Sequence, residues 1–275
     1  MGSSAFHFDR ITHRGVLTVF EKYQPASFII LKSTQAGYDL VGYSTRNLFF
    51  GSMGASVEGV DVQPQILDAL ASESVIHDGR LKGGQSSGKS IGPLIQSQWG
   101  QGEYYNYYCP RDSRGPNGRT YVGCVAVAVG QVLRYYGRYN AMNFQYTYDS
   151  GYYGKLTAQI GPYNWAAMEN NPIAVNLETC DLLSDLGILL QMTYGPSGSS
   201  TNSHRTLEAF HGMGYTEGVI LRKAKFSNES WTEVFYDNLS DYKPILVTGG
   251  GHAFICDGYN EDGLFHFNLG WEGYG

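Results

Sequence analysis

The sequence predicts an α+β fold in which a helical half packs against an antiparallel sheet. Helical patterns dominate the middle of the chain and strand patterns dominate from residue 244 onward, so the elements are segregated rather than alternating as βαβ units. The 275 residues, of which 42% are hydrophobic and 16% charged, suffice for one large domain or two smaller ones and exclude a disordered chain.

The amino-terminal region, residues 1–80, is predicted to form a small α+β domain. Its strand-like runs lie at residues 16–20, 27–31 and 38–43, where β-branched and aromatic residues gather. A short helix is expected at residues 65–70. This region therefore has elements enough for an independent unit before the larger remainder of the chain.

A segment rich in Gly and Ser separates the first region from the rest. We expect residues 81–90 to be a flexible linker that is open to proteolysis. Residues 91–275 then form the largest region. At the other end, Met1–Ser4 are typical of an expression leader, so no export signal is expected in this chain.

The region 91–275 is predicted to begin with helices. Residues 124–136 alternate Val and Ala, which also fits a strand, but the length and the alanines favour a helix. Further helices are expected at residues 180–192, at 204–212 and, after residues 227–230, through 239.

The end of the chain is predicted to form the sheet. Strand patterns occupy residues 245–248, 252–257 and 264–269, and the turn at 260–263 joins the last two as a hairpin. Together with the preceding helices, these strands complete the two halves of the predicted α+β fold.

Composition excludes several classes of partner. A net charge of −6 without a Lys/Arg-rich run argues against nucleic acid. No stretch reaches the ~20 apolar residues that span a bilayer. Four cysteines at irregular spacing leave two disulfides open, and the absence of Cys-x-x-Cys and His-x-x-x-His patterns argues against zinc. We therefore expect no metal or other cofactor. The high content of glycine (36 residues) and tyrosine (22 residues) is more usual in secreted proteins than in cytosolic ones.

One cysteine and one histidine stand out as reactive candidates. Cys124 begins the apolar segment 124–136, and His252 follows three glycines late in the chain. A helix N-terminus and a nearby imidazolium both lower the pKa of a thiol, which makes this the pattern of a Cys/His nucleophile pair. A free cysteine alone is more often a small buried hydrophobe, but the residues around Cys124 favour the nucleophile.

Three further residues complete a predicted catalytic set. Asn268 lies on the strand predicted to pair with that of His252, where its amide oxygen can orient the imidazole in a Cys-His-Asn triad. Trp271 follows and can shield that contact from water. Gln101 offers a side-chain amide that, with the backbone N–H of Cys124, can hold an oxyanion.

These residues stand within motifs that resemble the streptopain family of papain-like cysteine peptidases. The resemblance covers residues 91–275 in the right order, and a weaker similarity links residues 28–31 and 40–44 to that family's inhibitory propeptide. The motifs are Trp99-x-Gln101, the run from Tyr105 to Pro110, Gly123-Cys124-Val-Ala, the run from Met192 to Ser199, Gly251-His252-Ala-Phe and Asn268-x-Gly-Trp271.

The resemblance implies a papain-like catalytic domain preceded by a propeptide, in a secreted zymogen that cuts itself in the linker. It would hydrolyse protein or peptide substrates through a thioester on Cys124, and the propeptide would cover the active-site cleft. His252 is then the base and later the acid, Asn268 the orienter, and Gln101 an oxyanion donor. The residues expected to line the substrate cleft are Tyr194, Ser197, Gly198, Ser199, Gly250 and Gly251.

Two departures from the family pattern keep other functions open. Leu269 stands where the family usually has Trp, and the chain stops at Gly275 before the further strands that the family has, through truncation or through a short sheet. A catalytically weakened scaffold that binds or inhibits another protein is therefore an alternative. A cysteine amidase or acyltransferase is another, because acyl-enzyme chemistry does not fix the acceptor.

Overall fold

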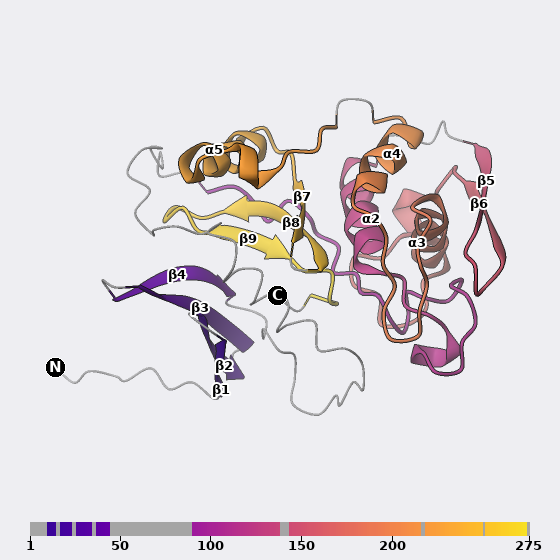
Figure 1. Cartoon of the computed structure of the whole chain (residues 1–275), viewed down its shortest axis with the longest axis horizontal. Coiled ribbons are helices and arrows are strands. Elements are labelled where there is room, and N and C mark those ends of the chain that lie inside the picture. The colour runs from indigo at the N-terminus through magenta and orange to yellow at the C-terminus, as the bar shows by residue number, and fades with distance from the viewer. Residues whose placement is uncertain are drawn as a thin grey trace.

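Figure 1 shows the computed structural model of the chain, which describes four amino-terminal strands and residues 90–137, 143–215, 218–249 and 251–273. The first sheet is an antiparallel meander in chain order, and its edge strand β4 lies beside β9 of the carboxyl-terminal sheet. Residues 65–70 and the linker 81–90 expected from the sequence fall outside the described residues, except for residue 90. The strands of the meander are β1 (Arg10–Arg14), β2 (Leu17–Tyr23), β3 (Ala26–Thr34) and β4 (Gly37–Ser44).

The predicted helices of the larger region are present. α2 (Cys124–Tyr136) and α4 (His204–Gly212) have the expected bounds, and α5 (Asn228–Ser240) nearly so. α3 (Leu177–Leu189) begins three residues earlier than predicted, because the side chain of Asn176 caps it by accepting from the N–H of Thr179 at 2.9 Å. Short 3₁₀ turns lie at Pro116–Gly118, Trp165–Ala167 and Lys223–Lys225.

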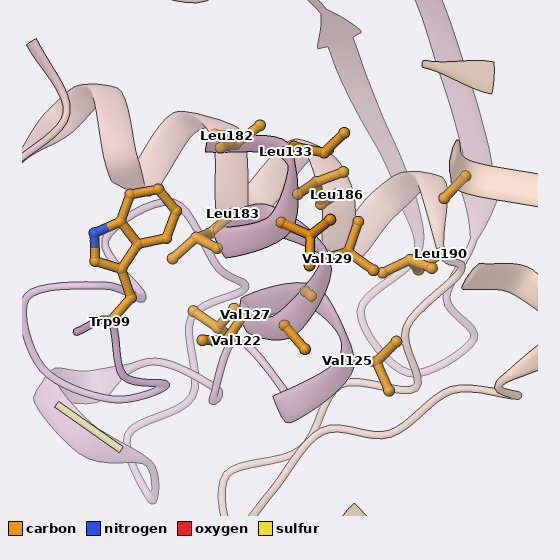
Figure 2. Packing of buried hydrophobic residues seen from close by; sticks show 14 of the residues in the cluster. Trp99, Val122, Val125, Val127, Val129, Leu133, Leu182, Leu183, Leu186 and Leu190 are labelled. Carbon is orange, nitrogen blue, oxygen red and sulfur yellow. The ribbon is translucent and has the colours of Figure 1, made fainter. Parts of the chain in front are cut away.

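The main core lies between α2 and α3. Figure 2 shows Trp99, Leu133 and Leu183 converging there, and Trp99 and Leu183 are fully buried. Gly130 brings the two helices close, because a Cβ at this position would lie 2.8 Å from the side chain of Leu183. This packing fixes α2, and with it the position of Cys124.

A hairpin that the sequence analysis did not predict covers the outer side of α3. β5 (Phe144–Asp149) pairs antiparallel with β6 (Lys155–Ile160), with Phe144 opposite Ile160. Both strands contact α3, and β6 supplies the buried Ala158 and Ile160 to the main core. The helical half thus carries two strands of its own.

The carboxyl-terminal sheet has three antiparallel strands in the order β7-β8-β9. They are β7 (Ile245–Gly249), β8 (His252–Tyr259) and β9 (Phe265–Asn268), close to the predicted bounds. α2 packs on one side of β8 with Ala253 and Ile255, while α5 packs on the other with Cys256. The α+β prediction, with a helical half and a sheet half, is confirmed. Among the described residues, none of the helices has the length and apolar character needed to cross a membrane.

Candidate active site

The thiol of Cys124 lies at the N-terminus of α2 and is half-buried. Burial raises the pKa of this thiol, while hydrogen bonds from the backbone N–H groups of Ala253, Val125 and Cys124 itself act in the opposite direction. The first N–H groups of a helix have no partner within the helix, so they are available to the sulfur. The thiol is therefore neutral here, with donors already placed to hold a thiolate.

His252 opens strand β8 and is 4% exposed. Its Nε2 lies 2.9 Å from the backbone carbonyl oxygen of Leu269. Because a carbonyl only accepts, Nε2 carries the proton and Nδ1 is the nitrogen left to take one. Burial lowers the pKa of His252 to about 4, and the hydrogen bond to Leu269 acts in the other direction. The imidazole is therefore neutral near neutral pH and has one basic nitrogen.

The backbone links the two candidate groups. Ala253, whose N–H reaches the sulfur of Cys124, directly follows His252 in β8. Trp271 covers the imidazole, with ring centroids 4.9 Å apart, and Phe254 stacks nearly parallel to it at 6.1 Å. The thiol and the imidazole thus belong to one water-poor region where α2 meets β8.

Asn268 does not hydrogen-bond to His252 directly, contrary to the expectation from the sequence. Its Oδ1 accepts from Gln131 Nε2 at 3.1 Å, and its Nδ2 donates to the carbonyl of Ser97 at 2.9 Å. The reason is register: Asn268 pairs with Ile255, and side chains alternate along a strand, so Asn268 and His252 belong to opposite faces of the sheet. The carbonyl of Leu269 takes the place that was assigned to the Asn268 amide.

Gln101 lies close to the start of α2 through its backbone. Its carbonyl accepts from the N–H of Val122 at 2.9 Å, two residues before Cys124. Its half-buried side-chain amide has no hydrogen-bond partner within the described part of the chain. This position is compatible with an oxyanion donor beside the N–H of Cys124.

The loop 195–200 lies against the segment that precedes Cys124. A Cβ at Gly123 would lie 3.0 Å from the carbonyl oxygen of Ser199, and Ser199 Oγ donates to the carbonyl of Tyr121 at 2.6 Å. Ser199 is therefore buried and engaged, whereas Ser197 and Gly198 are exposed. Of the contacts predicted in this loop, Ser197 and Gly198 are therefore accessible to a ligand.

The expected substrate contact at Tyr194 is wrong. Tyr194 is 7% exposed and belongs to the main core, where its hydroxyl occupies the space left by Gly187 of α3. Gly251, which immediately precedes His252, is exposed and has φ +81°. Gly250 lies outside the described residues.

The other three cysteines are free and buried. Burial raises the pKa of Cys109 to about 12 and that of Cys180 to about 11, and it also raises the pKa of Cys256. These thiols are unreactive at neutral pH because the thiolate is the nucleophile. In the part of the chain that the structure describes, His, Cys, Asp and Glu side chains form no group of three that could hold a metal ion.

Two groups of the candidate site were not predicted from the sequence. The carbonyl of Leu269 is a backbone group, so no side-chain motif marks it. Gln131 received no role from the sequence, yet it is fully buried and hydrogen-bonded to Asn268. An uncharged polar residue seven positions after Cys124, within the otherwise apolar stretch up to Leu133, was the available signal.

Comparison with known sequences gives consistent matches. The sequence profile of the Peptidase C10 family matches residues 99–275. The thiol protease/hemagglutinin PrtT of Porphyromonas gingivalis is 31% identical over 216 residues, a match that covers 67% of this chain and 24% of that protein. Streptopain of Streptococcus pyogenes is 28% identical over 283 residues, covering 90% of this chain and 69% of streptopain. This chain therefore spans about a quarter of the first relative and about two thirds of the second.

Comparison with solved structures gives the same fold. A cysteine-to-alanine mutant of a prointerpain A fragment from Prevotella intermedia matches with a TM-score of 0.78 and 23% identity, over 97% of this chain and 89% of that one. Active wild-type interpain A, a cysteine protease of the same organism, matches with a TM-score of 0.61 and 26% identity, over 67% and 83%. The first match extends through the amino-terminal sheet.

Proposed function

The chain belongs to the Peptidase C10 family of cysteine peptidases, and from this premise we propose that Cys124 is its nucleophile and His252 its general base. The observation that supports the assignment is the environment of the sulfur. The sulfur lies at the N-terminus of α2 and accepts hydrogen bonds from backbone N–H groups. One of these groups belongs to Ala253, the residue that follows His252. Cys109, Cys180 and Cys256 are each at most 2% exposed, which leaves Cys124 as the accessible thiol.

The reaction proceeds through a thioester. Nδ1 of His252 takes the thiol proton, and the thiolate attacks the carbonyl carbon of a peptide bond. The N–H of Cys124 and the amide of Gln101 stabilise the resulting oxyanion. His252 then protonates the leaving amine, the C–N bond breaks, and a thioester remains. A water molecule that loses its proton to His252 attacks the thioester and releases the carboxylic acid and the thiol.

We propose further that the chain is an exported precursor. Residues 1–80 act as a propeptide over the cleft, residues 81–90 contain the processing site, and residues 91–275 are the peptidase. Support comes from the likeness of fold to the prointerpain A fragment over 97% of the chain and from the position of β4 beside β9. The burial that keeps both Cys124 and His252 neutral is compatible with a latent state. High Gly and Tyr content supports export.

The test is Cys124→Ala in the full-length chain. The variant is expected to keep its linker intact and to hydrolyse no peptide, while remaining cleavable when a trace of the parent protein is added. A Cys124→Ala chain that matures alone at the parent rate contradicts the assignment. Cys109→Ala is the matched control, because it removes a buried thiol and leaves maturation intact.

Labelling distinguishes this proposal from a non-catalytic binding scaffold. A thiol-reactive epoxide labels Cys124 rapidly and stoichiometrically in a peptidase, because only an activated thiolate reacts fast. A scaffold without that activation labels no faster than a free thiol. The substitution at Leu269 does not favour the scaffold, since the group that holds His252 is the Leu269 carbonyl. Product analysis with and without added amines separates hydrolysis from acyl transfer.

A further inference from the structure

The geometry points to Gln131 and Asn268 as positioning residues that hold the Leu269 carbonyl, and through it the imidazole of His252, at a fixed place relative to Cys124. This inference deepens the proposed function and rests on it. Gln131 donates from Nε2 to Asn268 Oδ1 at 3.1 Å, and this amide contact joins α2 to the end of β9. We call the pair Gln131–Asn268 the amide bridge.

The turn that follows β9 fixes the position of the Leu269 carbonyl. Asn268 Oδ1 also accepts from the N–H of Gly270 at 3.1 Å, which closes an Asx turn around Leu269. Gly270 has φ +69°, and a Cβ there would lie 3.1 Å from Val127 of α2. The turn therefore fixes the direction of the Leu269 carbonyl, which is the group that accepts from His252 Nε2.

Asn268 is itself held by Gln131 and by the backbone of Ser97. Gln131 is fully buried, and its Oε1 accepts from Ser97 Oγ at 3.1 Å and from the N–H of Trp99 at 3.2 Å. The Nδ2 of Asn268 donates to the carbonyl of Ser97 at 2.9 Å. Each amide of the bridge thus has partners for both its oxygen and its nitrogen, as a buried polar network requires.

Cys124 and the amide bridge are both attached to α2. Cys124 and Gln131 are seven residues apart in α2, which is about two turns and places both on the same side of the helix. The helix therefore carries the sulfur directly and locates the imidazole through Gln131, Asn268 and Leu269. A rigid helix with both connections keeps the distance between the reacting groups constant while substrates come and go.

The test compares full-length chains that carry Gln131→Glu, Asn268→Ala or both. Gln131→Glu is nearly isosteric: it retains an oxygen for Ser97 and Trp99 and replaces the donor that faces Asn268 Oδ1. Linkers are cut by a trace of the parent protein, and kcat and KM are measured on an internally quenched peptide with the sequence of residues 79–92. Tyr163→Phe is the control, because it removes another buried hydrogen bond, to Asp185 at 3.0 Å.

Each single substitution is expected to lower kcat by about 10- to 100-fold with KM changed less than about 2-fold. The two limbs of the pH profile of kcat/KM should move toward each other, because a displaced imidazole stabilises the thiolate less and the thiolate stabilises the imidazolium less. The double variant should be no slower than the slower single variant. Tyr163→Phe should lower the melting temperature and leave the limbs in place.

The inference is overturned if Gln131→Glu lowers the melting temperature but leaves kcat and both limbs at their parent values. It is also overturned if the losses in the two single variants multiply in the double variant. Should Gln131→Glu not fold, Asn268→Ala gives the comparison, because it removes the oxygen that accepts from both Gln131 Nε2 and the N–H of Gly270. These results contradict the positioning role alone when Cys124→Ala is inactive, whereas an active Cys124→Ala contradicts the proposed function.

Discussion

His252 Nε2 and the backbone carbonyl oxygen of Leu269 lie 2.9 Å apart, and this contact defines the tautomer of the imidazole. A side-chain amide at Asn268 was expected to have this role, and a carbonyl in the next residue has it instead. A backbone acceptor is insensitive to the identity of its own side chain. The contact is therefore compatible with leucine at a position where the resemblance led us to expect tryptophan.

Leu269→Ala should consequently separate stability from catalysis. The side chain is 7% exposed, so its truncation is expected to lower the free energy of unfolding by about 2–4 kcal/mol. The rate kcat/KM of the folded protein should stay within about 3-fold of the parent, because the carbonyl is retained. Urea unfolding and peptide hydrolysis give the two quantities. A loss above about 30-fold in fully folded protein contradicts the role of the carbonyl.

Gly123→Ala should damage the site, and Gly118→Ala provides a matched control. Both glycines have positive φ, +96° and +70°, so each alanine is strained. A Cβ at Gly118 meets nothing within 4 Å, whereas at Gly123 it would lie 2.9 Å from Met192 Cε and 3.0 Å from the carbonyl oxygen of Ser199.

Gly118→Ala is expected to cost about 1–2 kcal/mol and to leave kcat unchanged. Gly123→Ala is expected to cost more and to lower kcat by about 10-fold or more, because the residue before Cys124 must shift. Chemical denaturation and hydrolysis rates test both. Equal kcat values in the two variants would mean that Cys124 can be displaced without loss of activity. That result would contradict the proposal that the N-terminus of α2 positions the thiol.

Asp185→Asn should change how stability depends on pH. Burial, with the charge of Asp181 next, raises the pKa of Asp185 to about 7, while the hydrogen bond from Tyr163 acts in the opposite direction. In the unfolded chain this carboxyl loses its proton near pH 4. Between about pH 4 and about pH 7 the unfolded state therefore holds fewer protons, and raising the pH lowers the free energy of unfolding.

The variant has no proton to lose at this position, so its melting temperature relative to the parent should rise by a few degrees between about pH 4 and about pH 8. Thermal melts at several pH values measure the difference. A constant difference between Asp185→Asn and the parent across this range contradicts the raised pKa.

The sequence was sufficient for the elements whose periodicity is strong. Residues 124–136 have a long apolar run with alanines, and α2 has the predicted bounds. The β5–β6 hairpin was missed although Phe144, Tyr146 and Tyr148 alternate with exposed residues in a half-buried strand. Its strands pack on α3 rather than within the main sheet, so segregation of helices and strands along the chain gave no indication of them.

For the site, motifs located residues but not the direction of their side chains. Asn268 was assigned to His252 because their strands pair, yet the register shifts at a bulge between Cys256 and Gly258, and Asn268 ends opposite Ile255. A single-residue change of register moves a side chain to the other face, which a sequence alone does not reveal. Tyr194 was likewise assigned to the cleft, although the space beside Gly187 receives it in the core.

The most direct measurement is the rate of alkylation of Cys124 by iodoacetamide from about pH 5 to about pH 9, in the parent and in His252→Gln after both linkers are cut. The other three cysteines are at most 2% exposed, so the label reports Cys124. Release of the propeptide is expected to relieve the burial that keeps both groups neutral in the latent chain. The parent should then react at a high rate well below the ordinary thiol pKa of about 8.5, and His252→Gln should react only as that pKa is approached. Identical pH profiles in the two proteins would contradict the pairing of Cys124 with His252.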